Sequence, residues 1–150
     1  MPARPASLTR HDYAALARFR FELRRFLVFS EHASHAVGLE PQQHQLLLAL
    51  RGLTSPERLP TIGNLANWLQ IQHHSAVELV DRAVARGLIQ RQQDPNDRRR
   101  VLVELTLEGT AVLSQLSIQH REELESTAPA LIDALRAVLQ SPLEDQGLPG

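Results

Sequence analysis

Apolar residues recur at intervals of three and four along most of the chain, which predicts a protein built mainly from helices. The first predicted helix runs from Thr9 to about Val37, and Gly38 ends it. Its apolar positions spread until they nearly surround the helix, which indicates burial on several sides. In a chain of this size, that pattern favours contact with a second subunit.

Three shorter helices are predicted next, over residues 42–53, 61–69 and 72–86. Thr61 can cap the second of them. Asn64 stands where a complete capping box has Glu or Gln, so we expect that box to be incomplete. Because only two residues separate the last two helices, they are expected to cross steeply, as in a helix-turn-helix.

The apolar spacing then changes to that of two strands, over residues 88–92 and 101–105, with a turn at Asp94-Pro95-Asn96-Asp97 between them. A hairpin directly after a helix-turn-helix is a wing. Beyond it the pattern predicts a long helix over residues 107–126 and a last helix over residues 129–140. The predicted fold class is therefore mainly α with a small β-hairpin wing.

The composition excludes several kinds of site. The 150 residues include no cysteine, which rules out a disulfide framework, a thiol nucleophile and a cysteine zinc site. The net charge is −1, and all 16 basic residues are arginines. The charge is uneven, because residues 72–100 carry 6 arginines against 4 acidic residues, whereas residues 101–150 carry 2 against 8. This asymmetry indicates that the middle of the chain meets a polyanion.

No apolar run approaches the length of a membrane span, and the first residues, MPARPASLTRH, contain no apolar signal core. We therefore expect a cytoplasmic protein that does not contact a membrane. Residues 1–8 and 141–150 are expected to be loose ends. The sequence contains no nucleophile elbow, phosphate loop or paired-carboxylate motif, so neither an enzyme nor a cofactor is expected.

The stretch LVDRAVARGLIQRQQDPNDRRRVLVELTLEGTAVL, residues 79–113, follows a segment that reads Gly38-Leu39-x-Pro41-x-Gln43. Together with the order of the elements, it resembles the MarR family of bacterial transcription regulators. The resemblance implies a homodimer in which residues 1–37 and 107–150 form dimerisation helices. Residues 38–106 would form a winged helix-turn-helix domain that binds a pseudo-palindromic operator in double-stranded DNA. It also implies a ligand-responsive regulator, with repression as the expected mode and a small-molecule effector as a further partner.

The residues expected to meet DNA lie on the recognition helix and the wing. Gln, His, Ser and Glu can bond to base edges, and Val can contact a thymine methyl group. The helix candidates are Gln72, His73, His74, Ser75, Val77, Glu78 and Arg82. Arg82 and Arg86 could each hold the DNA backbone or pair with neighbouring acids. The wing candidates are Arg98, Arg99 and Arg100, for contacts to phosphates and the minor groove. By resemblance, Asp97-x-Arg99 matches the family's wing motif, so Arg99 is expected in the groove with Asp97 orienting it. The alternative reading is a solvated helix face and a solvated turn.

An effector pocket in this family lies between the dimer layer and the winged helix. Phe29, His32, His44 and Trp68 are the residues expected to line it, although ordinary packing of these side chains is the alternative.

Two other functions stay open. His32 and His35 share a helix face, and His44 and His120 could join them, which allows a zinc-sensing regulator of the same fold. Surface or core histidines are the commoner outcome, so we assign no metal. The other alternative is a winged helix that contacts only proteins, against which the three wing arginines argue.

Overall fold

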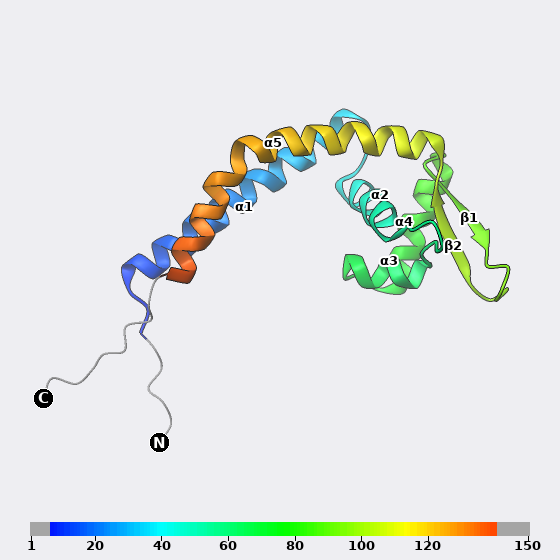
Figure 1. Cartoon of the computed structure of the whole chain (residues 1–150), viewed down its shortest axis with the longest axis horizontal. Coiled ribbons are helices and arrows are strands. Elements are labelled where there is room, and N and C mark those ends of the chain that lie inside the picture. Colours follow the sequence, from blue (N-terminus) through cyan, green and yellow to red (C-terminus); the bar gives the residue numbers. More distant parts are fainter. Residues whose placement is uncertain (1–6, 141–150) are drawn as a thin grey trace, which may run out of the picture. The chain divides into compact units, whose positions relative to one another are not determined.

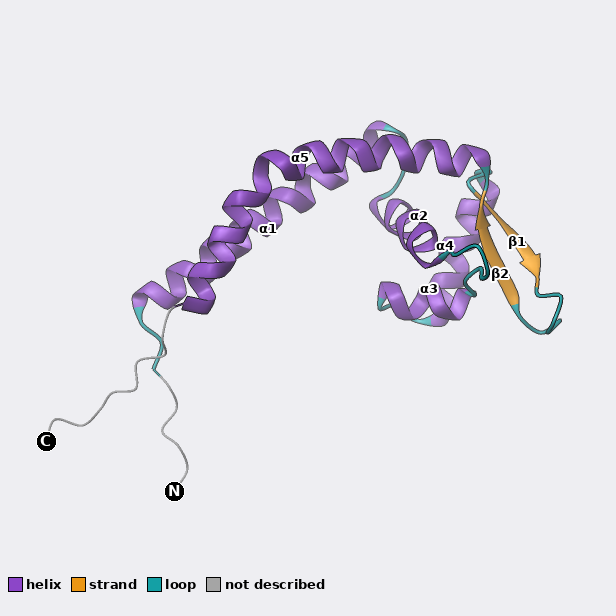
Figure 2. Ribbon diagram, viewed as in Figure 1, coloured by secondary structure: helices purple, strands orange, loops and turns teal. Residues whose placement is uncertain are grey.

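A computed structural model describes residues 7–140; residues 1–6 and 141–150, which hold most of the predicted loose ends, lie outside the described part. Helices make up most of the described chain, and its one sheet is a two-stranded hairpin (Figures 1 and 2). The predicted fold class is confirmed. The elements in chain order are α1 (Arg10–Ala36), α2 (Pro41–Leu53), α3 (Ile62–Leu69), α4 (His73–Ala85), β1 (Ile89–Gln93), β2 (Val101–Leu105) and α5 (Leu107–Gln140).

The first helix is confirmed to within one residue at either end. At its start, the backbone N–H of Thr9 donates to Asp12 Oδ2 at 2.7 Å, and the N–H of Asp12 donates to Thr9 Oγ1 at 3.2 Å. At its end, Gly38 has a φ of 77°, a left-handed conformation that glycine adopts without steric cost.

The cap of α3 differs from the prediction, because its capping box is complete. The N–H of Asn64 donates to Thr61 Oγ1 at 3.1 Å, and the N–H of Thr61 donates to Asn64 Oδ1 at 2.9 Å. The asparagine amide oxygen thus takes the place that a Glu or Gln oxygen usually has. The prediction of an incomplete box was wrong because it allowed only Glu or Gln at this position, whereas the amide oxygen of Asn64 accepts the same hydrogen bond.

Residues 30–119 form one compact unit that contains the helix-turn-helix and the hairpin. Its helices α2, α3 and α4 pack against one another, and the hairpin packs against α2 and α4. The apolar stripe predicted for the recognition helix is fully buried in this core, at Ala76, Leu79, Val80 and Ala83. The largest fully buried side chains around it are Leu39, Leu46, Leu47, Leu50, Leu65 and Leu116.

The wing hairpin pairs β1 with β2 in antiparallel register, from Ile89 opposite Leu105 to Gln93 opposite Val101. The first strand begins one residue later than predicted. The hydrogen-bonded turn spans Asp97–Arg100, where the N–H of Arg100 donates to the carbonyl of Asp97 at 3.0 Å. The predicted turn at residues 94–97 is instead a side-chain turn, since Asp94 Oδ1 accepts from the N–H of Asn96 at 2.8 Å.

Thr106 and Gly109 join the hairpin to α5. Thr106 Oγ1 donates to the carbonyl of Gly87 at 2.6 Å, and its N–H donates to the carbonyl of Leu88 at 3.1 Å. The same hydroxyl accepts from the N–H of Gly109 at 3.1 Å. One threonine therefore caps α5 and ties it to the start of the wing.

The two predicted C-terminal helices form one helix, α5, with Pro129 inside it. Proline has no backbone N–H to donate, and its ring crowds the carbonyl four residues earlier. In a helix of 34 residues, the intrahelical hydrogen bonds continue on both sides of that position. The prediction of a break was wrong because a proline alone does not end a helix that is otherwise well formed.

Residues 7–29 and 120–140 belong to a second unit. Here the ring of His120 meets the rings of Phe26 and Phe29 edge-on, with centroid distances of 6.0 and 5.4 Å. Glu22 is buried, and its carboxylate lies 3.0 Å from an Arg18 nitrogen. Several large apolar side chains of this unit remain exposed, among them Tyr13, Leu16, Phe21, Leu27, Val28, Ile132, Leu135 and Leu139. None of the helices in residues 7–140 is long and apolar enough to cross a membrane.

Candidate nucleic-acid interface

The outward face of α4 carries the predicted base-reading residues. Burying the Ala76–Ala83 stripe turns the opposite face outward, because positions three and four apart share one side of a helix. Ser75 and Val77 are half-buried at the edge of this face. The exposed candidates are Gln72, His73, His74, Glu78 and Arg82.

The N-terminus of α4 is open to a ligand. Gln72 is its N-cap residue, in an extended conformation, and makes no side-chain hydrogen bond to the first turn. Gln is a poor cap, so the side chain of this residue does not engage the first backbone N–H groups of the helix. Those groups and the helix dipole favour a phosphate at this end.

The tip of the wing presents three arginines, all of which are exposed. Asp97 Oδ1 accepts from the backbone N–H of Arg99 at 3.1 Å and lies 3.4 Å from its side-chain Nε. The Arg99 side chain is nevertheless 93% exposed, so its guanidinium remains available to a partner. The amide of Gln93 donates to the carbonyl of Arg98 at 3.1 Å, which further ties the tip to β1. The carboxylate thus braces the arginine at its base and leaves the outer end free.

An ion pair that the sequence analysis did not identify connects the recognition helix to the wing. Arg91 on β1 donates to Asp81 on α4. Beside it, the amides of Gln90 and Gln92 both donate to Glu104 across the hairpin. Pairing between residues ten positions apart on different elements leaves no periodic signal in the sequence. The Arg91–Asp81 pair thus joins the wing to α4, whereas the two amide contacts to Glu104 join the strands of the hairpin to each other.

Arg86 finds partners that neither of the predicted alternatives included. Its guanidinium donates to the carbonyl of Gly38 and to Gln43 Oε1, the latter at 3.3 Å. The same Gln43 oxygen accepts from the N–H of Glu40 at 3.2 Å at the start of α2. Arg86 therefore joins the end of the recognition helix to the start of α2. Both Arg82 and Arg86 are exposed.

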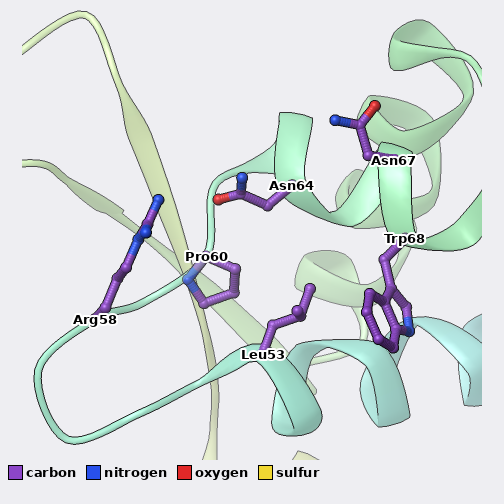
Figure 3. Close-up of a pocket in the computed structure, with 6 residues that line it drawn as sticks. All are labelled: Leu53, Arg58, Pro60, Asn64, Asn67 and Trp68. Atoms are coloured by element: carbon purple, nitrogen blue, oxygen red, sulfur yellow. The ribbon is translucent and has the colours of Figure 1, made fainter.

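The four candidate effector residues lie in different surroundings. Trp68 is exposed and lines a recess together with Leu53, Arg58, Pro60, Asn64 and Asn67 (Figure 3). His32 is exposed on α1, and His44 is buried in α2. Phe29 contacts His120. Phe29, His32 and His44 are not among the residues that line the Trp68 recess.

Among residues 7–140, no three His, Asp or Glu side chains are grouped so that they could hold a metal ion. His35 Nε2 lies 3.7 Å from Glu40 Oε2, and both side chains are exposed.

The helix-turn-helix with its buried inner stripe, its exposed recognition face and the arginine-tipped hairpin together define a winged helix-turn-helix protein. Residues 37–100 match the MarR family. The winged helix-turn-helix of this chain is therefore similar to the MarR family, which is the resemblance that the sequence predicts. This is a family of transcriptional regulators, not of enzymes.

The curated relatives of this chain are named as transcriptional regulators too. The chain is 33% identical over 92 residues to YcgE of Bacillus subtilis, which is named as an HTH-type transcriptional regulator; the match covers 61% of this chain. The chain spans 57% of the length of the curated relatives that it matches.

Solved structures share the fold. AbsC, a MarR family transcriptional regulator from Streptomyces coelicolor, has a TM-score of 0.69 at 19% identity, and the match covers 85% of this chain and 82% of AbsC. A mutant MarR from E. coli complexed with operator DNA has a TM-score of 0.61 at 22% identity, with 80% and 89% of the two chains covered.

Proposed function

We propose that this protein is a dimeric, ligand-responsive transcriptional regulator that binds a pseudo-palindromic DNA operator and represses transcription. The observation that carries the proposal is the pairing of an open recognition-helix face with a braced, exposed arginine in the adjacent wing. A regulator of this kind works where the chromosome is, in the bacterial cytoplasm.

In the proposed complex, α4 enters the major groove with its N-terminal turn toward the bases. His73, His74 and Ser75 offer hydrogen bonds to base edges, and Val77 offers a methyl contact to thymine. Gln72 and Glu78 flank them as further polar contacts, and Arg82 faces the phosphate backbone. The open first turn of α4 supports this placement, since free backbone N–H groups there can hold a phosphate.

The wing is proposed to add a contact that depends on charge more than on base identity. Arg99 enters the minor groove, and Arg98 and Arg100 contact phosphates on either side. The hydrogen bond that Arg99 Nε donates to Asp97 supports this assignment, because it limits the directions that the exposed side chain can take. Asp81 and Arg91 hold the wing against α4, so both elements can meet one duplex.

Dimer formation is proposed through the unit made of residues 7–29 and 120–140. Phe21 is 57% exposed, Tyr13 61% and Leu139 76%, although each would stabilise the protein by leaving water. A second copy that covers such side chains would form a symmetric dimer, and a symmetric dimer reads a palindromic site. A dimer seated on an operator blocks other proteins from that DNA, which is why repression is the proposed mode.

Sedimentation velocity tests the dimer. Phe21→Asp should convert the protein to a monomer at micromolar concentration. Leu48→Asp is the matched control, because Leu48 is similarly exposed at 51% but lies on α2, in the winged-helix unit. A wild-type protein that sediments as a folded monomer would contradict this part of the proposal.

DNA binding is tested on a duplex selected from a random pool, at several salt concentrations. Arg99→Ala removes two charges per dimer, so the slope of log affinity against log salt should flatten by about 1.8. Arg51→Ala, an exposed arginine of α2, is the control and should leave the slope unchanged. An unchanged slope in Arg99→Ala would show that the wing does not contact the DNA.

Substitutions in α4 and in the wing should change DNA binding in different ways. His74→Ala or Ser75→Ala should cost about 1–3 kcal/mol on the selected duplex and little on a scrambled one, because each removes a neutral group over one base position. Equal losses on both duplexes would mean that α4 positions the protein without reading sequence.

A further inference from the structure

The recess beside Trp68 is formed by the end of α2, the connection over residues 54–61 and the outer side of α3 (Figure 3). Its volume is about 390 Å³, which lies within the range of small-molecule sites. It is thus large enough for a two-ring organic molecule.

The indole of Trp68 forms the wall at one end of the recess and is unusually exposed. Trp68 is 65% exposed, although burying so large an apolar side chain would stabilise the protein. Figure 3 shows the indole extending from α3 toward α2, with Leu53 and Pro60 between it and Arg58. The flat ring and the two apolar side chains give the recess a surface that suits a flat apolar body.

The polar groups of the recess are mainly hydrogen-bond donors. Arg58 is the charged residue that lines it, and its guanidinium forms no ion pair with the other residues of the described part, 7–140. Asn64 uses its amide oxygen to accept from Thr61, which leaves its NH₂ group as a donor. A guanidinium with a nearby amide donor binds a carboxylate better than a neutral group.

The recess is held in shape before any ligand arrives. Ser55 and Arg58 exchange backbone hydrogen bonds of 3.0 and 3.2 Å, which shape the connection that carries the guanidinium. The carbonyl of Pro60 accepts from the N–H of Val103 on β2 at 2.9 Å, and the Thr61–Asn64 box fixes the start of α3. Binding would therefore require little ordering of the backbone.

We propose that this recess binds a flat organic monocarboxylate, with its ring system against Trp68 and Pro60 and its carboxylate at Arg58. The site lies within the winged-helix unit and does not include Phe29, His32 or His44. Binding here does not require DNA, so the proposal can be tested separately from the proposed function.

The test uses the one tryptophan of the full chain, whose indole N–H gives one resonance in a proton–nitrogen correlation spectrum. The probe is sodium 2-naphthoate, titrated to about 5 mM, which detects binding with a dissociation constant of about 1 mM. We expect the indole resonance to move and to saturate. No movement over this range overturns the proposal.

Two comparisons test the role of charge. Arg58→Gln should weaken naphthoate binding by about tenfold or more, because a charge-assisted pair is lost. Arg51→Gln, an exposed arginine of α2 that does not line the recess, should bind as the wild type does. Neutral 2-naphthamide should bind about tenfold more weakly than the acid. Equal affinity of Arg58→Gln and wild type, or of amide and acid, overturns the proposal.

Discussion

Replacing Gly109 with alanine should destabilise the winged helix, even though alanine normally strengthens a helix. Gly109 is buried in the first turn of α5 and lies against the backbone where the wing begins. A Cβ atom built on it would lie 1.9 Å from the carbonyl oxygen of Leu88 and 2.9 Å from its carbonyl carbon. Ordinary contact begins at 3.4 Å, so one backbone segment would have to move by about 1.5 Å.

The size of the effect follows from three terms. Alanine in a helix is favoured over glycine by about 1 kcal/mol. Crowding in a packed core costs about 1–3 kcal/mol. The carbonyl of Leu88 also accepts from the N–H of Thr106 at 3.1 Å, and losing that bond costs about 1 kcal/mol more. We therefore expect Gly109→Ala to lower the free energy of unfolding by about 2 kcal/mol.

Urea denaturation followed by circular dichroism measures this change. All variants must be compared at one protein concentration, because the stability of the proposed dimer would depend on concentration. Gly52→Ala is the matched control, since Gly52 also lies in a helix and an added Cβ there meets nothing within 4 Å. That variant should gain about 0.5–1 kcal/mol. If Gly109→Ala proved as stable as the wild type, the close approach of α5 to Leu88 would be wrong.

Three further experiments test local features that stabilise the winged-helix unit. Gln70 has a φ of 56°, so Gln70→Gly should raise the unfolding free energy by about 0.5–1 kcal/mol in a urea titration; a loss would show that its side chain matters more than its backbone. Asn64→Ala should cost about 1 kcal/mol in thermal unfolding by opening the box with Thr61, and no loss would argue against that box. In a double-mutant cycle, Asp81→Ala and Arg91→Ala should couple by about 0.5–1 kcal/mol in unfolding, and fully additive effects would mean that the pair is not formed.

Some elements were predictable because their causes are local. Helix α1 and the buried stripe of α4 follow from the spacing of apolar residues. Both helices begin and end within a residue or two of the predicted bounds. Gly38 and Gly87 both have positive φ where the sequence predicts helix ends. Neighbouring residues determine these features, so a single sequence is enough to find them.

Other features were predicted wrongly because two local signals competed. Pro129 suggested a break, yet the helix continues through it. In the wing, proline and the Asx residues favoured a turn at residues 94–97, but the backbone hydrogen bond forms at Asp97–Arg100. In both places the surrounding element decided the outcome, because the hydrogen bonds on either side outweigh the preference of one residue.

By itself, the sequence determined the order of the elements up to the start of α5, the buried face of the recognition helix and the residues that face outward from it. Those properties depend on residue type at short spacing. The tertiary structure alone decided that Arg91 pairs with Asp81 and that Arg86 holds the carbonyl of Gly38. It also placed Arg58 and Trp68 in one recess. These contacts join residues 10 to 48 positions apart, and arginine, which is equally suited to solvent, to an acid or to a carbonyl, acquires a partner only when packing brings one within reach.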